Sequence, residues 1–360
     1  MLQKLFKDLH LPLILAVIGL AALGLFFIYS ASFRDPGQYE VKQIFWIAIG
    51  LAVMIAVPYL GYRPFISVAY LFYGFSILLL ILVYFVGSTR LGAQRWLTLG
   101  PFVIQPSEFA KLGTLLALVN YLGSHNPVQG QLKIVLGALA IVAVPWILVA
   151  KQPDLGSALL FVPMVLTILF LWGIRWRYLI IALAGVLVAA PLAWEMLKEY
   201  QRKRILVFLN PNLDPLGSGY TAVQSKIAVG SGGLFGKGYL AGTQTQLHFV
   251  PEHHTDFIFC VIGEELGFIG SMLVLCLYAY LFHSIFLIMQ HTTDIKAKLL
   301  SGGVLALLVA HVLINVGMTI GLMPIAGVPL PLVSYGGSSF VMNCIALGLV
   351  LSVYKERSIF

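Results

Sequence analysis

Charged residues are scarce in this chain of 360 residues: Asp, Glu, Lys and Arg make up only 10% of it, whereas 60% of the residues are hydrophobic. Soluble domains carry roughly 25% charged residues, so this much apolar surface cannot be hidden inside a water-soluble core. The composition therefore indicates an integral membrane protein. We expect no appended soluble catalytic domain and no nucleic-acid partner.

Cysteine is also scarce. The three cysteines, Cys260, Cys276 and Cys344, all lie inside apolar runs, and no two of them have the Cys-x-x-Cys spacing. This pattern excludes a disulfide framework and a cysteine zinc site, and it favours buried thiols that pack as small hydrophobic groups.

Long apolar runs are abundant. About 20 residues of helix cross the hydrocarbon layer at 1.5 Å per residue, and runs of this length recur throughout the chain. We therefore predict an all-α membrane protein with one polytopic domain, residues 1–360. The first run is longer than the roughly 7 to 15 apolar residues of a signal peptide, so we expect it to be retained. The ten predicted spans are residues 11–31, 43–60, 65–86, 106–122, 134–150, 156–172, 179–197, 257–289, 299–322 and 335–354.

The distribution of Lys and Arg between the spans predicts the orientation. If both termini are cytoplasmic, the inner connections hold ten basic residues and the short outer connections hold three, as the positive-inside rule requires. The inner set is Lys4, Lys7, Arg63, Lys133, Arg175, Arg177, Lys296, Lys298, Lys355 and Arg357, and the outer set is Arg34, Lys42 and Lys151.

One long polar segment, residues 198–257, interrupts the apolar pattern between the seventh and eighth spans, and we expect it to be an extracytoplasmic loop. Basic residues on the outer side of a membrane do not serve orientation. They indicate either an anionic ligand handled at that face or contacts with lipid phosphates and helix ends. The residues concerned are Arg90, Arg95 and Lys111 near one outer segment, and Lys198, Arg202, Lys203, Arg204, Lys226 and Lys237 in the long one.

Asp256 is the foremost candidate for chemistry. It follows Thr255 at the start of the eighth span, so we expect it in the first helical turn, where the helix dipole favours a negative charge. That position alone could explain it. However, carboxylates at membrane depth are functional by default, and Glu252, His253 and His254 lie beside it. We therefore interpret Asp256 as a catalytic or ligand-binding residue.

Several other polar residues have structural and functional interpretations that the sequence leaves open. Glu108 and Lys111 are three apart, as in an intrahelical ion pair, but Lys111 would bind phosphate if it faced a cavity. Glu264 and Glu265 lie deeper in the eighth span, Glu264 about 12 Å below Asp256, and each could pair with a buried cation. Asp154 resembles a helix cap. Residues 334–339, which include Ser338, offer either backbone N–H groups to an oxyanion or a close helix contact. His311 and Asn315 are polar groups that we expect to bond neighbouring helices.

The glycine-rich run at residues 230–238 is not a nucleotide-binding loop. It has Ser231 in place of the first glycine and Gly238 in place of the Ser or Thr that a P-loop requires. With no nucleotide site, a bond-forming reaction at the outer face must use an activated substrate already in the membrane. A lipid-linked diphosphate sugar fits, because its diphosphate needs Arg or Lys and its acceptor hydroxyl needs a base.

These segments resemble the SEDS (shape, elongation, division, sporulation) family of peptidoglycan polymerases, and the resemblance covers nearly the whole chain. Pro329 is typical of the elongation branch, since the division branch tends to carry Thr there. The matching segments are residues 92–96 (GAQRW), 105–108 (QPSE) with Lys111, 152–156 (QPDLG), 214–217 (DPLG), 224–226 (QSK), 232–233 (GG), 251–257 (PEHHTDF), 264–267 (EELG), Asn315 and 327–338 (GVPLPLVSYGGS).

The resemblance implies a ten-span glycosyltransferase in the cytoplasmic membrane. Such an enzyme polymerises lipid II into β-1,4 glycan at the outer face during cell elongation. It works with a class B penicillin-binding protein and other membrane proteins of the elongation complex. The family's essential carboxylate maps onto Asp256, and roles near Glu108, Lys111 and Arg204 are also implied.

We predict Asp256 as the general base and Arg95, Lys111 and Arg204 as cations that neutralise the leaving diphosphate. Substrate contacts are also predicted for Glu108, His253, His254 and Ser338. A divalent cation (Mg²⁺ or Mn²⁺) held by Asp256 or by the group of Glu252, His253 and His254 stays open. Two other functions remain in play: a lipid II flippase, since intramembrane charges suit transport, and a scaffold that only activates a penicillin-binding protein.

Overall fold

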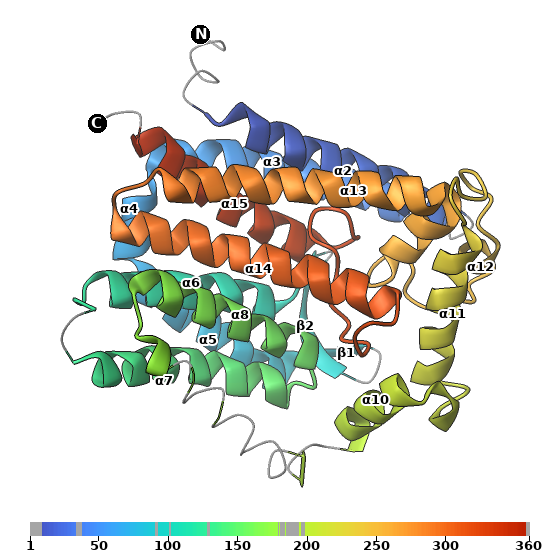
Figure 1. Ribbon diagram of the computed structural model, residues 1–360, viewed down its shortest axis with the longest axis horizontal. Helices are drawn as coiled ribbons and strands as arrows, with labels where there is room; N and C mark the ends of the chain where they lie inside the picture. Colours follow the sequence, from blue (N-terminus) through green and yellow to red (C-terminus); the bar gives the residue numbers. More distant parts are fainter. Residues whose placement is uncertain are drawn as a thin grey trace.

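The computed structural model describes residues 9–33, 38–90, 93–100, 102–127, 130–178, 180, 184, 194–195 and 199–357. The long helices form one bundle with nearly parallel axes, and shorter helices cover one of its ends (Figure 1). The helices are α2 (Leu11–Ser32), α3 (Tyr39–Leu60), α4 (Tyr62–Ser67), α5 (Ala69–Val86), α6 (Pro106–Gly123), α7 (Gln131–Lys151), α8 (Leu155–Trp172), α10 (Glu199–Leu209), α11 (Ser218–Ser231), α12 (Thr243–Gln246), α13 (Ile258–Gln290), α14 (Ile295–Thr319) and α15 (Gly337–Arg357).

The membrane-spanning character predicted from composition is confirmed. Eight of the described helices are long and apolar enough to cross a membrane. Nine of the ten predicted spans coincide with described helices, while the seventh, residues 179–197, lies largely outside the described residues. The predicted third span is divided at Val68 into α4 and α5. Helix α6 is not one of these eight, and its polar residues Glu108 and Lys111 are buried within the bundle.

The bundle is built from neighbouring pairs. Helix α3 packs on α15, α5 on α6, α8 on α14 and α2 on α13. Small residues allow this close approach, as is common between membrane helices. A Cβ at Gly50 would lie 2.7 Å from the ring of Phe340, and one at Gly337 would clash with the indole of Trp46. Gly337, at the start of α15, therefore serves helix packing, one of the two interpretations that the sequence left open for residues 334–339.

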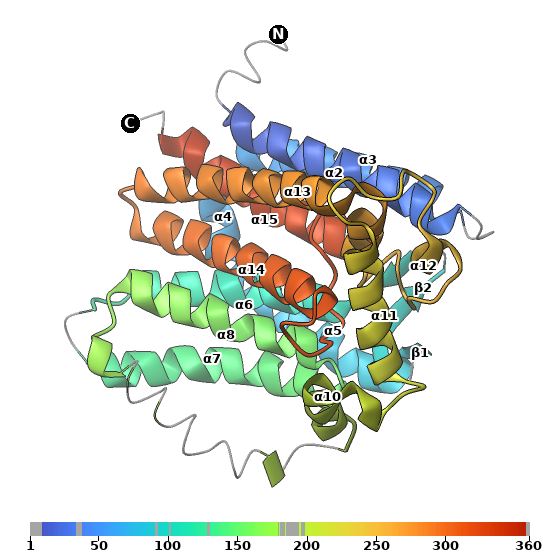
Figure 2. The same cartoon turned by 45° about the vertical axis from the view of Figure 1, so that its right-hand side comes forward.

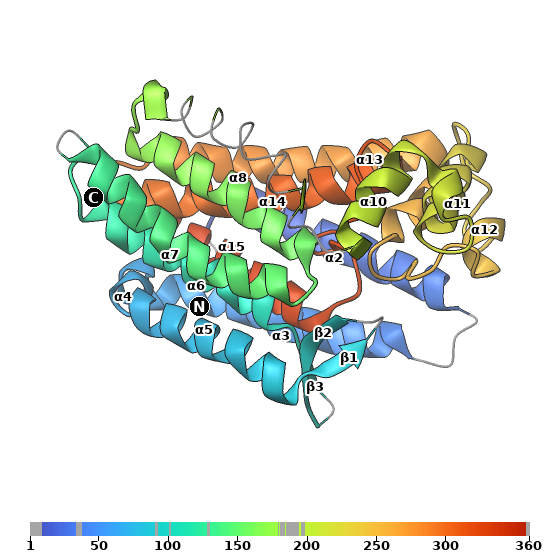
Figure 3. The ribbon, with the colours of Figure 1, turned by 90° about the horizontal axis from the view of Figure 1, so that it is seen from below.

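The two ends of the bundle differ. Helix α2 begins and α15 ends at one end, and helices α10, α11 and α12 lie at the other, which we call the capped end (Figure 1). The capped end also holds a three-stranded antiparallel sheet in the order β1 (Ser88–Arg90), β2 (Ala93–Leu99) and β3 (Phe102–Ile104), visible in Figure 3. The sequence did not predict this sheet. The long polar segment contains α10, α11, α12 and a 3-10 turn, η1 (Pro211–Leu213).

Helix α13 is interrupted at Gly267, whose φ of 65° is not helical, so the helix changes direction there (Figure 2). A break inside a membrane helix leaves backbone groups without partners, which is tolerated only where the protein supplies new ones. The glycine-rich loop at residues 232–238 supplies them. The amides of Phe268 and Ile269 donate to the carbonyls of Gly233 and Leu234 at 2.9 and 3.1 Å.

The same loop satisfies the carbonyls on the other side of the break. The amides of Lys237 and Gly238 donate to the carbonyls of Glu264 and Glu265, both at 3.0 Å. This close backbone contact explains the glycines, because a Cβ at Gly236 would collide with the carbonyl oxygen of Glu265. The run that resembles a nucleotide-binding loop is therefore a structural partner of α13.

The Glu264 side chain anchors the same junction. Its carboxylate accepts hydrogen bonds from Lys237 Nζ at 2.7 Å and from the backbone amides of Gln244 and Thr245 at 2.8 and 3.0 Å. The predicted pairing of Glu264 with a cation is thus confirmed. Glu265 instead accepts a hydrogen bond from the hydroxyl of Ser30 on α2.

We predict that Gly236→Ala destabilises the fold and that Gly230→Ala does not. Gly236 has a φ of 80° and no space for a Cβ, whereas nothing lies within 4 Å of a Cβ at Gly230 in α11. The expected loss for Gly236→Ala is about 2 kcal/mol or more of unfolding free energy. Unfolding of the two purified variants in detergent would measure it. Equal stability of both variants would contradict the proposed role of the loop.

Candidate active site

Asp256 lies at the capped end, in a turn that precedes α13. The helix begins at Ile258 with Phe257 as its N-cap, so Asp256 is not in the first helical turn as predicted. Thr255 is not the N-cap either, since its hydroxyl donates to the carbonyl of Glu252 at 3.2 Å. The Asp256 residue is partly buried. The helix dipole explanation is therefore weakened, because the carboxylate lies outside the helix that would supply the dipole.

Asn315 of α14 fixes the turn that carries Asp256. The Asn315 amide nitrogen donates to the backbone carbonyls of Asp256 and Val328 at 2.8 and 2.7 Å, and the residue is fully buried. A second tie comes from Ser334, whose hydroxyl donates to the carbonyl of Thr255 at 2.6 Å. The predicted bond of Asn315 to a neighbouring helix is thus a bond to two loop carbonyls. Together these contacts fix the backbone that carries Asp256.

Gly327 leaves space beside the carboxylate. It has a φ of 67°, and a Cβ placed on it would lie 3.3 Å from Oδ2 of Asp256. A side chain at this position would cover the carboxylate. The absence of a side chain at Gly327 therefore leaves Oδ2 of Asp256 uncovered at this position.

The charges around Asp256 set its acidity. The pKa of the Asp256 carboxyl is raised to about 6, mainly by burial and to a smaller extent by the negative charges of Glu252 and Asp154. The cations Arg95 and Arg204 act in the opposite direction. A carboxyl group with such a pKa is ionised at neutral pH and still basic enough to accept a proton. The structure thus brings Asp256 together with two of the three cations predicted to face it.

Arg95 is held by a polar network at the junction of β2, α6 and α8. Its Nη1 lies 3.5 Å from Oδ1 of Asp154, which caps α8 by accepting from the Ser157 amide at 3.2 Å. Gln105 donates from Nε2 to Oδ2 of Asp154 at 3.2 Å, and its backbone amide donates to the hydroxyl of Ser338 at 3.4 Å. Asp154 is therefore a helix cap as predicted, and Ser338 belongs to the same network.

Glu108 and Lys111 form the predicted ion pair, with 2.9 Å between Oε1 and Nζ. The Lys111 side chain is only 5% exposed, and its Nζ also lies 2.8 Å from Nε2 of His311 on α14. The buried pair links α6 to α14. The alternative in which Lys111 faces an open cavity is not what the structure shows.

The two neighbouring histidines differ. His253 is buried, and its ring nitrogens lie 2.9 and 2.8 Å from the carbonyl oxygens of Val250 and Ala31. This placement gives His253 a structural position between the turn and α2. The His254 ring is partly exposed and lies beside Tyr39, with 4.6 Å between ring centroids. Tyr39 carried no sequence signal, because it lies ahead of the predicted second span.

A metal site is less well supported by the geometry. Within the part of the chain that the structure describes, no three His, Cys, Asp or Glu residues gather closely enough to hold a metal ion. Glu252 is close enough to Asp256 to raise its pKa, and both residues carry the carboxylate oxygens that Mg²⁺ or Mn²⁺ prefers. They would fit such an ion only if water or a substrate completed its coordination.

Comparisons with known proteins agree with this arrangement. The chain is 42% identical to peptidoglycan glycosyltransferase MrdB of Escherichia coli K12, over 99% of this chain and 96% of that one. It is 34% identical to peptidoglycan glycosyltransferase RodA of Treponema pallidum, over 98% of each.

Two solved structures are similar over almost the whole fold. One, described as a peptidoglycan synthase complex that coordinates polymerization and crosslinking, contains a chain that is 35% identical with a TM-score of 0.84, covering 97% of this chain and 98% of that one. The rod shape determining protein RodA of Thermus thermophilus is 32% identical with a TM-score of 0.73, covering 97% of each chain. The model of the FtsW/RodA/SpoVE family, described as cell cycle proteins, matches residues 11–359, and the chain therefore belongs to this family.

Proposed function

We propose that this protein is a peptidoglycan glycosyltransferase of the elongation branch, which polymerises lipid II into β-1,4 glycan. The observation that carries the proposal is Asp256, a partly buried carboxyl with a pKa of about 6 between two arginines at the capped end. Membership of the FtsW/RodA/SpoVE family and the names of the MrdB and RodA relatives support the same function.

The proposed reaction joins two lipid-linked saccharides. The 4-hydroxyl oxygen of the acceptor sugar attacks the anomeric carbon of the donor, and its proton passes to the Asp256 carboxylate. The bond between the anomeric carbon and the diphosphate oxygen breaks, and the diphosphate leaves with the electron pair. Attack from the face opposite an α-linked diphosphate gives a β linkage, so the anomeric carbon is inverted.

Arg95 is the cation that we assign to the leaving diphosphate. Of the nearby cations, Arg95 lowers the pKa of Asp256 the most, and its ion pair with Asp154 fixes its position before the substrate arrives. A fixed cation stabilises charge as it develops in the transition state. Lys111 and Glu108 are buried together, so we assign them a supporting role, in which they hold α6 against α14. His254 and Ser338 remain proposed substrate contacts. His253 is not proposed as one, because its two ring nitrogens lie within hydrogen-bond distance of the Val250 and Ala31 carbonyls.

A divalent cation remains a proposal. If bound by Asp256 and Glu252 it would add positive charge next to the diphosphate. The residues described above would then keep their roles in binding and proton transfer.

The proposed location is the cytoplasmic membrane, with both termini in the cytoplasm and the capped end outside. Support comes from the positive-inside count and from the bundle, in which α2 begins and α15 ends at the opposite end from α10, α11 and α12 (Figure 1). The proposed partner is a class B penicillin-binding protein with transpeptidase activity, together with other elongation-complex proteins. The similarity to a chain from a complex that couples polymerization to crosslinking supports this partner.

Purified protein with lipid II in detergent, together with a partner whose transpeptidase is inactivated, separates this function from its rivals. We expect glycan chains from the wild-type protein and a loss of at least about hundredfold for Asp256→Asn, since positioned acid–base catalysis contributes roughly 10²- to 10⁴-fold. Glu199→Gln, at an exposed carboxylate of α10, is the matched control and should retain activity.

Each rival predicts a different result in that experiment. Lipid II scrambling in vesicles without any glycan would favour a flippase. If Asp256→Asn lost only the binding of the partner, the scaffold hypothesis would gain.

The polymerisation rate should rise with pH through about 6, the pKa of Asp256. Below that value the carboxyl is protonated and cannot accept the hydroxyl proton, and above it the base is present. Glu252→Gln removes a negative charge that raises this pKa, so its acid limb should move to lower pH. Initial rates between about pH 4 and 8 would locate the acid limb of the wild-type protein and that of Glu252→Gln, on either side of the pKa of a carboxyl base. An acid limb that Glu252→Gln left in place would argue against Asp256 as the titrating base.

Asn315→Leu should lower kcat roughly 10- to 100-fold with little change in KM, because a small misplacement of a catalytic group is costly. The substitution removes the hydrogen bonds to the Asp256 and Val328 carbonyls but touches no substrate. Asn343→Leu is the control, since Asn343 donates to the Ser339 carbonyl within α15. Steady-state rates over a range of lipid II concentrations would separate the two constants. An equal loss in both variants would contradict a positioning role for Asn315.

A further inference from the structure

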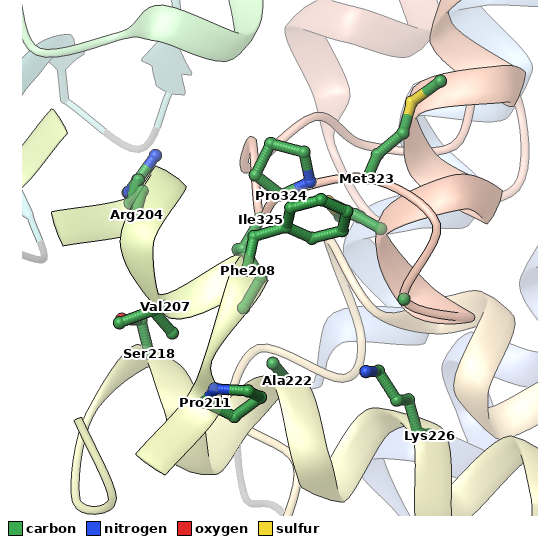
Figure 4. A pocket seen from close by; sticks show the side chains of 12 residues that line it. Arg204, Val207, Phe208, Pro211, Ser218, Ala222, Lys226, Met323, Pro324 and Ile325 are labelled. Carbon is green, nitrogen blue, oxygen red and sulfur yellow. The ribbon is translucent and has the colours of Figure 1, made fainter. Parts of the chain in front are cut away.

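A pocket lies beside the proposed site, between α10, α11 and the segment that follows α14. The space enclosed by its walls is small, about 20 Å³, and it reaches about 360 Å³ only when the open mouth is counted, so an occupant would lie largely in the mouth. Figure 4 shows Arg204 of α10 and Lys226 of α11 on opposite sides of it, with Phe208, Pro324 and Ile325 between them. The pocket therefore combines two cations with an apolar wall.

The charge of the lining is unbalanced. The lining residues include Arg204, Lys226 and the hydroxyl of Ser218, but no Asp or Glu. None of the ion pairs among the described residues includes Lys226. Its aliphatic stem packs against Gly321, whose φ is 77° and where a Cβ would collide with the lysine. Among the lining side chains, an anion would meet two positive charges. The Asp214 carboxylate behind Ser218 accepts a hydrogen bond from that residue's hydroxyl at 3.0 Å and is paired with Lys203.

The helices that form the pocket expose apolar side chains on their outer surface. Leu206 and Leu209 of α10 are 42% and 73% exposed, and Leu216, in the turn that leads to α11, is 95% exposed. Exposed leucines beside basic residues are typical of helices that lie at a membrane interface. A lipid chain could therefore enter the pocket from the bilayer while its phosphate met Arg204 and Lys226.

The pocket adjoins Asp256 without containing it. Ile325 forms part of the pocket wall, and Gly327, only two residues later, lies beside Oδ2 of Asp256. Two residues span at most about 7 Å. The pocket and the carboxylate thus both border one short strip of backbone, residues 325–327.

The proposed reaction needs two anionic sites, because both substrates are lipid diphosphates. Arg95, fixed by Asp154, provides one of them next to Asp256. We propose that the pocket between α10, α11 and residues 321–325 is the second, and that Arg204 and Lys226 bind the diphosphate of the acceptor lipid while its first isoprenoid units lie on Phe208 and Ile325. This inference rests on the proposed function and changes the role of Arg204, which no longer serves the leaving group.

Binding of a polyprenyl diphosphate to the full chain tests the proposal without catalysis. The measurement uses the Asp256→Asn variant in detergent, with a second substitution at Lys226. Lys226→Met keeps the aliphatic stem over Gly321 and removes the charge, so affinity should fall about tenfold, as expected for a charged hydrogen bond. Lys226→Arg should retain binding. Lys203→Gln is the matched control, since Lys203 is exposed on α10, pairs with Asp214 and does not line the pocket.

Kinetics of the otherwise wild-type enzyme provide a second readout. Lys226→Met should raise the KM for lipid II about tenfold and change kcat less than about twofold, because it weakens binding and not the transition state. Unchanged affinity and KM in Lys226→Met would overturn the proposal. So would displacement of the polyprenyl diphosphate by equimolar phosphatidylglycerol, which would identify the pocket as a general phospholipid site. A protein that bound polyprenyl diphosphate as predicted but made no glycan would contradict the proposed function instead.

Discussion

The backbone of a membrane helix can be interrupted only where its freed amides and carbonyls find new partners, and this requirement organises the capped end. At Gly267 the partners come from residues 233–238, which bond to both sides of the break in α13. Glu264 then ties the same junction to Lys237 and to the start of α12. The polar segment between the seventh and eighth predicted spans is therefore part of the folded membrane domain, and the turn that carries Asp256 starts from a fixed base.

Much of the helical architecture could be predicted, because apolar runs of span length have few other stable forms in a bilayer. The interruption of α13 could not be predicted in the same way. Gly267 lies in an apolar run where a glycine more often serves close helix packing, and its non-helical φ depends on residues 233–238 being in contact. The sheet at Ser88–Ile104 was missed because its strands are short and depend on one another for their hydrogen bonds.

The candidate site could be predicted in part. Local pairs such as Glu108 with Lys111, and the cap at Asp154, follow from spacing along one helix. Contacts between distant segments do not, and His311 beside Lys111 or Asn315 beside Asp256 became visible only in three dimensions. The prediction that failed locally was the start of α13. Thr255 is a good helix cap by composition, but its hydroxyl and carbonyl are used by Glu252 and Ser334, and the helix begins later.

The strip at residues 325–327 is a wall shared by two sites. Ile325 lines the pocket, and two residues later a Cβ on Gly327 would lie only 3.3 Å from Oδ2 of Asp256. A compound bound against Ile325 would contact the same short stretch of backbone that borders the Asp256 carboxylate. Such a compound would reach the neighbourhood of the proposed base without resembling a sugar, which is a distinct starting point for antibiotic chemistry.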